Sequence, residues 1–184
     1  RLEKISGMPG PFTESQAFRH LGELASKNNE PPSFVGAGAY NHYIPASVDH
    51  LASRSEFYTA YTPYQAEVSQ GTLTAIFEFQ TMICRLTGMD IANASMYDGA
   101  TSLAEAVLMS SRTSRKNKIV VSETVHPHYR QVLNTYAWAN DLSILEVPTS
   151  GGVSDLNGIK QALTDEVSAV VVQNPALFGC IEEV

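Results

Sequence analysis

The sequence predicts an α/β fold with a mostly parallel sheet, and two observations support this prediction. Apolar, β-branched runs recur at residues 119–121, 143–147 and 169–173, with centres about 25 residues apart, and helical patterns fill the intervals. Strands that alternate with helices at this spacing form parallel sheets joined by right-handed crossovers. Ligands of such sheets collect beyond the carboxyl ends of the strands, so we expect a site there.

Composition limits the class of protein. The chain has 184 residues, of which 43% are hydrophobic, so it can bury a core without disulfides. Cys84 and Cys180 lack metal-binding spacing, which indicates reduced thiols and a cytoplasmic protein. No apolar run reaches the roughly 18 residues of a membrane span. The net charge of -7 argues against nucleic-acid binding.

The N-terminal part is predicted to contain one amphipathic helix. Thr13 and Gln16 have capping-box spacing ahead of an apolar stripe, and a proline pair follows that stripe. We therefore assign residues 1–33 to an N-terminal arm and helix. Residues 34–184 are assigned to the N-terminal part of a larger domain.

Two patterns near residue 40 suggest cofactor or metal binding only weakly. Gly36 and Gly38 are followed by Asn41 where a dinucleotide fingerprint has its third glycine, so we interpret this segment as a loop. His42 and His50 have no third ligand nearby, and we expect no metal site.

The middle of the chain is predicted as helix, strand, turn and helix. Residues 69–87 carry a helical apolar stripe that Gly88 ends. A short strand is expected at residues 90–94, a glycine turn at 95–99 and a second helix at 100–111. A glycine turn between a strand and a helix points N–H groups and the positive helix end outward, which suits phosphate. An ordinary capped turn explains the same residues equally well.

An aromatic segment precedes these elements. Tyr58, Tyr61 and Tyr64 lie within seven residues, beside Thr62, in a pattern too irregular for a helix seam and too polar for a central strand. We expect a loop with several hydroxyl donors. The alternative is that the phenol rings pack in the core, where each OH finds a partner.

Polar residues follow the predicted strands at their carboxyl ends, and we call this set the rim. His126 also has a plain interpretation as a helix-start residue before Pro127, and both interpretations stay open. The rim consists of Asp98, Gly99, Thr101, Glu123, His126, His128, Gln173, Asn174 and Pro175.

Four runs in the chain resemble one known family. The runs SEFYTAYTPYQAEVSQGTL, FQTMICRLTGMDIANASMYDGAT, VSETVHPHYRQVL and QNPALFGCIEEV are similar to the P-protein of the glycine cleavage system, in particular to the first subunit of its two-subunit form. The resemblance implies the large domain of the pyridoxal-phosphate (PLP) enzymes of the aspartate-aminotransferase fold type (fold type I). The chain is shorter than members of this family, so we expect a partial protein with an incomplete large domain.

The resemblance also implies a reaction and its partners. Glycine is decarboxylated with PLP, and the aminomethyl group passes to the lipoyl arm of H-protein. This chemistry needs a Schiff-base lysine, and we expect the homologous subunit 2 to supply that lysine and to bind PLP. Every lysine of this chain lies in an arm, a connection or an exposed helix face: Lys4, Lys27, Lys116, Lys118 and Lys160.

The resemblance assigns roles to two groups of residues. The tyrosine loop, defined as Tyr58, Tyr61, Thr62 and Tyr64, would reach the partner's cofactor or the glycine carboxylate. On the rim, His126 would stack on the pyridine ring and Asn174 would bond the ring hydroxyl, in a site that is either working or vestigial. The phosphate turn of that site would be Asp98, Gly99, Ala100 and Thr101.

Two other functions stay open. The chain is alternatively a non-catalytic scaffold for its partner, or a self-sufficient PLP enzyme of another reaction type.

Overall fold

A computed structural model describes residues 10–32, 34 and 40–183 of the chain. The chain divides into two compact units, Arg1–Asn41 and His42–Val184, and each is described by itself. The assignment of a partial large domain from residue 34 onward stays a prediction.

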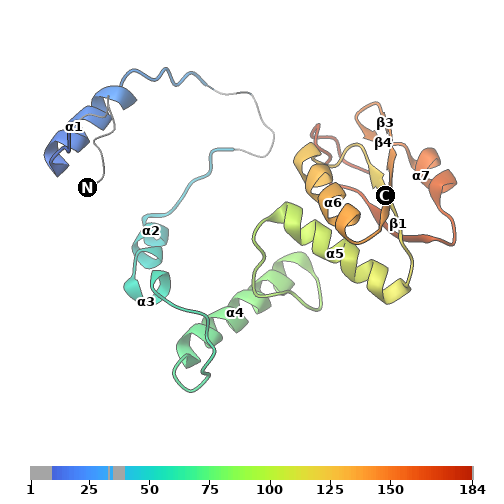
Figure 1. Ribbon diagram of the computed structural model, residues 1–184, viewed down its shortest axis with the longest axis horizontal. Coiled ribbons are helices and arrows are strands. Elements are labelled where there is room, and N and C mark those ends of the chain that lie inside the picture. Colours follow the sequence, from blue (N-terminus) through green and yellow to red (C-terminus); the bar gives the residue numbers. More distant parts are fainter. Residues whose placement is uncertain (1–9, 33, 35–39, 184) are drawn as a thin grey trace, which may run out of the picture. The chain divides into compact units, whose positions relative to one another are not determined.

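The first unit contains the predicted amphipathic helix, α1 (Glu14–Ala25) (Figure 1). Thr13 caps this helix, and both reciprocal hydrogen bonds of a capping box are present. The capping prediction is therefore confirmed. Lys4 and the predicted loop glycines Gly36 and Gly38 lie outside the described residues.

The second unit begins with three helices. The first two, α2 (Ala46–Ala52) and α3 (Ser55–Tyr58), are shorter than the window in which helical periodicity is detectable, so the sequence did not predict them. The third, α4 (Gln70–Thr87), is confirmed. Gly88 ends it with a φ of 73°, a left-handed conformation that glycine adopts without strain.

The predicted strand at residues 90–94 is wrong, because the structure shows a loop there. Strand formation requires a neighbour that pairs with the backbone. Here the carbonyl of Ala92 instead accepts a hydrogen bond of 2.6 Å from the Gln80 side chain in α4. The glycine turn therefore joins a loop, and not a strand, to helix α5 (Gly99–Ser114), which was predicted.

The three later strands form the predicted parallel sheet. They are β1 (Lys118–Ser122), β2 (Ser143–Val147) and β5 (Val167–Val171), in the order β2-β1-β5. The last strand lies two residues earlier than the predicted run at 169–173, because Lys118 pairs with Val167 ahead of a register irregularity.

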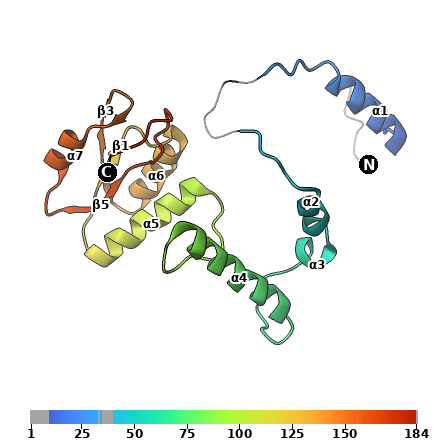
Figure 2. The same cartoon turned by 180° about the vertical axis from the view of Figure 1, so that it is seen from behind.

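Helices cover both faces of this sheet (Figures 1 and 2). Helices α5 and α6 (Pro127–Ala139) pack on one face against Ile119 and Val121. Helix α7 (Leu156–Ala162) packs on the other face against Val120. Because successive side chains of a strand point to opposite faces, the central strand is buried on both sides.

A small hairpin, β3 (Thr149–Ser150) and β4 (Val153–Ser154), lies between β2 and α7 and was not predicted. Gly151 and Gly152 form its turn with φ values of 64° and 87°, which explains the glycine pair. None of the helices in the described ranges has the length and apolarity needed to cross a membrane.

Candidate functional site

The tyrosine loop is exposed. The side chains of Tyr58, Tyr61 and Tyr64 are 68%, 80% and 78% exposed, and the last two rings lie 5.9 Å apart at 54°. The alternative that these rings pack in the core does not hold in this chain. Their hydroxyls are instead accessible to a partner chain or ligand.

One part of the loop prediction is wrong. Tyr58 is the last residue of α3, where its N–H donates to the carbonyl of Arg54 at 3.2 Å. Tyr61, Thr62 and Tyr64 follow in irregular structure, as predicted.

The first residue of the phosphate turn, Asp98, accepts hydrogen bonds from other residues of the same turn. Asp98 is the N-cap of α5, and its Oδ1 accepts hydrogen bonds of 2.8 Å from both the N–H and the hydroxyl of Thr101. The Ser102 hydroxyl donates to the Asp98 carbonyl at 2.7 Å. The backbone and side-chain bonds from Thr101 hold the pKa of the Asp98 carboxyl below its usual value, so this group is an anion at neutral pH.

A tyrosine from the next helix lies directly over the turn. A Cβ atom placed on Gly99 would overlap the Tyr129 hydroxyl oxygen, so a larger residue at this position would require Tyr129 to shift. Tyr129 also contacts the His126 ring at a centroid distance of 5.4 Å. Tyr129 lies in one of the intervals that the sequence predicted as helical, and the sequence gave no signal of this contact.

The helix-start interpretation of His126 is confirmed. His126 is the N-cap of α6, its Nδ1 accepts a hydrogen bond of 3.1 Å from the His128 N–H, and Pro127 occupies the first turn. Its own N–H donates to Gln173 Oε1 at 2.9 Å, which links the segments after β1 and β5. The stacking role of His126 stays a prediction.

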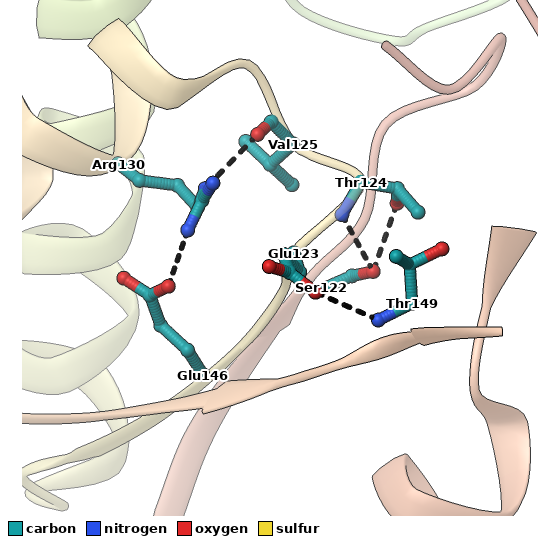
Figure 3. Close-up of polar contacts among 7 residues, drawn as sticks. All are labelled: Ser122, Glu123, Thr124, Val125, Arg130, Glu146 and Thr149. Carbon is teal, nitrogen blue, oxygen red and sulfur yellow. Dashed lines mark hydrogen bonds and ion pairs between the residues drawn. The ribbon is translucent and has the colours of Figure 1, made fainter. Parts of the chain in front are cut away.

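An ion pair supports the start of the same helix (Figure 3). Arg130 donates from Nε to the carbonyl of Val125 at 3.1 Å and pairs through Nη1 with Oε2 of Glu146 in β2. On the neighbouring strand end, Glu123 Oε2 accepts a hydrogen bond of 3.0 Å from the Thr149 N–H. These contacts fix the rim to β2 and the hairpin.

A buried carboxylate, absent from the sequence predictions, closes the rim at its far end. Glu182 is 6% exposed, and its carboxylate accepts from the Thr124 hydroxyl at 3.1 Å and from the Ser154 hydroxyl and N–H at 3.0 Å. Its own N–H donates to Asn174 Oδ1 at 3.2 Å. The pair of glutamates in the sequence gives no signal of burial, because such pairs usually face solvent.

The structure therefore brings the rim together but does not connect it to the tyrosine loop. Contacts link Gly99 to Tyr129, Tyr129 to His126 and His126 to Gln173. Among the hydrogen bonds and ring contacts of the described residues, none joins the tyrosine loop to the rim.

The rim does not fit PLP as a resident cofactor. The phosphate turn already carries a carboxylate and is covered by the Tyr129 hydroxyl. Of the described lysines, Lys118 begins β1, at the strand end opposite the rim, and Lys160 lies on the exposed face of α7. Lys27 and Lys116 lie just after α1 and α5. None of the described lysines of the second unit is therefore placed to bond a cofactor at the rim.

Comparison with known proteins gives consistent relatives. The family profile described as "Glycine cleavage system P-protein" matches residues 1–184. A Moorella thermoacetica protein named "Probable glycine dehydrogenase (decarboxylating) subunit 1" is 54% identical over 99% of this chain and 41% of its own length. A Bacillus subtilis protein of the same name is 58% identical over 92% of this chain and 39% of its own.

A solved structure agrees with these relatives. The crystal structure of "glycine decarboxylase (P-protein) of the glycine cleavage system, in inhibitor-bound form" matches with a TM-score of 0.87 and 46% identity, over 99% of this chain and 41% of that one. The chain thus spans about two fifths of the length of the relatives it matches. The resemblance and the fold-class prediction are confirmed, and the chain belongs to the glycine cleavage system P-protein family.

Proposed function

We propose that this chain is part of a subunit that completes the active site of a two-subunit, PLP-dependent glycine decarboxylase. In this reaction glycine loses its carboxylate as CO2, and the aminomethyl group passes to the lipoyl arm of H-protein. The observation that carries the proposal is the 54% identity, over 99% of the chain, with a relative named as subunit 1 of glycine dehydrogenase (decarboxylating).

The subunit contributes the tyrosine loop, while PLP and its Schiff-base lysine belong to the homologous subunit 2. Two findings support this division: the rim does not fit PLP, and the tyrosine side chains of the loop are exposed among the described residues. Hydroxyls held in a partner's site orient the glycine carboxylate, and the aromatic rings exclude water from it. The two subunits thus contribute different groups to one active site.

The partners in this proposal are subunit 2, lipoylated H-protein and glycine. The proposed compartment is the cytoplasm, because Cys84 and Cys180 are both free thiols, as expected in a reducing environment.

Replacing Tyr61 and Tyr64 by Phe in the full-length subunit, reconstituted with its partner, tests the proposal. Each substitution removes one hydroxyl and keeps the ring. If either hydroxyl orients substrate, kcat/KM for glycine decarboxylation falls more than tenfold, which corresponds to about 1.4 kcal/mol of transition-state stabilisation. Light scattering verifies assembly of the complex.

Tyr43→Phe is the matched control, because this tyrosine is 90% exposed and lies outside the loop. Unchanged turnover in the loop variants, with intact assembly, would favour the scaffold alternative. Glycine turnover by the full-length subunit without its partner would contradict the shared site and favour a self-sufficient enzyme.

A further inference from the structure

We propose that Asp98 is a specificity-determining residue that closes the phosphate turn of this chain to phosphate, by capping α5 in the position that an anionic ligand would occupy. The inference rests on the proposed function only for the identity of the excluded group, the phosphate of PLP.

Asp98 already engages hydrogen-bond donors that a phosphate at the turn would use. The N-terminus of a helix binds anions because its first N–H groups lack partners within the helix. Here the Thr101 N–H, which is one of these groups, donates to Asp98 Oδ1 at 2.8 Å, and the Thr101 hydroxyl donates to the same oxygen. The Ser102 hydroxyl is turned back to the Asp98 carbonyl at 2.7 Å. Both hydroxyls that could bind a phosphate at this turn are therefore engaged by Asp98.

The turn also already holds a negative charge, that of Asp98. The Asp98 carboxylate is exposed and ionised at neutral pH, since its bonds to Thr101 stabilise the anion. The positive end of α5 is thus already neutralised by a group of the chain itself. A phosphate placed at the same turn would meet a like charge and would have to displace a covalently tethered competitor.

The space beside Gly99 at the turn is also occupied. A turn that holds phosphate leaves the side of its glycine open to the ligand, which is why glycine is used there. At Gly99 that side is filled by the Tyr129 side chain, with its hydroxyl oxygen 2.2 Å and its ring carbon 2.8 Å from where a Cβ would be. The glycine therefore serves helix packing in this chain.

The chain also offers a matched control for the cap. Asp155 is the N-cap of α7 and accepts one hydrogen bond of 3.1 Å, from the Asn157 N–H. Helix α7 has only seven residues, and Gly158 in its first turn faces Asp155 and Val147 and not a tyrosine, so we expect no phosphate binding when this cap loses its charge.

The experiment uses full-length subunit 1 assembled with its partner and loaded with PLP, so that the partner's cofactor site is filled. Binding of radiolabelled inorganic phosphate is measured by equilibrium dialysis for Tyr129→Leu alone and for Asp98→Ser and Asp155→Ser in the same Tyr129→Leu background, because Tyr129 would otherwise still fill the space beside Gly99. Serine caps a helix without a charge. In this background we expect Asp98→Ser to bind phosphate at least tenfold more tightly than Tyr129→Leu alone, towards one phosphate per subunit 1, and Asp155→Ser to equal Tyr129→Leu alone.

Two results would overturn the proposal: one phosphate bound per subunit 1 in Tyr129→Leu alone, or no gain when Asp98→Ser is added. If Asp98→Ser does not assemble, Asp98→Asn replaces it, because asparagine keeps the cap and removes the charge, and the same gain is required. This experiment measures phosphate binding and not glycine turnover. A negative result therefore overturns the role of Asp98 without bearing on the proposed function, which the Tyr61 and Tyr64 variants test.

Discussion

Two carboxylates stabilise opposite ends of the rim by different physical means. Asp98 faces solvent and caps a helix, where its charge interacts favourably with the N–H groups of the first turn. Glu182 is buried and, among the described residues, has no lysine or arginine within ion-pair distance. Its carboxylate oxygens instead accept hydrogen bonds from the Thr124 hydroxyl and from the hydroxyl and N–H of Ser154. The stability that the Asp98 cap contributes depends on pH, and the stability that Glu182 contributes is lost when its side chain is removed.

Removal of the Glu182 side chain is expected to loosen the hairpin. In Glu182→Ala the Ser154 N–H loses its acceptor in a buried place, at a cost of about 1–3 kcal/mol. Native-state hydrogen exchange of the Ser154 amide should accelerate about tenfold or more, since every 1.4 kcal/mol changes an equilibrium tenfold.

Glu182→Gln is the control for this experiment, because it keeps one acceptor oxygen in place and should lose less protection. Equal acceleration in both variants would show that both carboxylate oxygens, and not the filling of the site, hold the hairpin. Unchanged exchange in Glu182→Ala would contradict the buried hydrogen bond itself.

The Asp98 cap predicts an acid-sensitive contribution to stability. The folded-state pKa of Asp98 is lowered by its bonds to Thr101. The contribution is therefore complete above the ordinary aspartate pKa of about 3.9, and it is lost as the pH falls through the lower folded-state value. Nuclear magnetic resonance titration of the Asp98 carboxyl carbon measures that pKa directly. A midpoint at or above the ordinary value would contradict the cap.

At the scale of elements, helices α5 and α6 determine how the rim is assembled. Both begin at the carboxyl edge of the sheet, both are capped by a side chain, and they pack against each other through Gly99 and Tyr129. Helix α4 behaves differently. Its sequence predicts a well-formed helix, yet none of its residues is buried among the described part of the chain. Most helical stability in proteins comes from packing of the apolar face, and α4 lacks that stabilisation in this chain.

Gly99→Ala is expected to disturb the contact between the two helices. The new methyl group would overlap the Tyr129 side chain, and overpacking of this kind costs about 1–3 kcal/mol. Thermal unfolding of the full-length protein should show a lowered midpoint.

Gly71→Ala is the matched control, because a Cβ on this glycine of α4 meets no atom within 4 Å, and alanine favours helix. Tyr129→Leu in the Gly99→Ala background should recover part of the loss. A Gly99→Ala midpoint no lower than that of Gly71→Ala would show that the close contact is not tight in solution.

At the scale of the whole molecule, the sheet has an open edge. Strand β5 is a border of the three-stranded sheet, and Val170 in it is 41% exposed. Many other apolar side chains are exposed as well, including Leu86 and Ile91 at 82% and 85%. Unpaired strand edges and large apolar surfaces promote association. The 184-residue polypeptide on its own is therefore expected to self-associate.

Val170→Lys should raise the monomeric fraction of the 184-residue polypeptide, since a charge on an edge strand opposes pairing with another edge. Size-exclusion chromatography with light scattering measures this fraction. Asn157→Lys adds the same charge on an exposed helical position and should have little effect. A monodisperse wild-type monomer that unfolds cooperatively would contradict the prediction.

The sequence by itself determined the α/β class, the parallel sheet and most helices, because alternation of apolar runs, capping residues and terminal glycines are local signals. The family followed from the resemblance of four sequence runs to the P-protein. It failed at residues 90–94, because strand formation depends on a neighbour that local pattern does not reveal. It also missed Glu182 and the contact of Tyr129 with Gly99, which join residues that are distant along the chain. Only the tertiary structure decided that the phosphate turn is filled by the chain's own groups, since occupancy of a space depends on what folds into it.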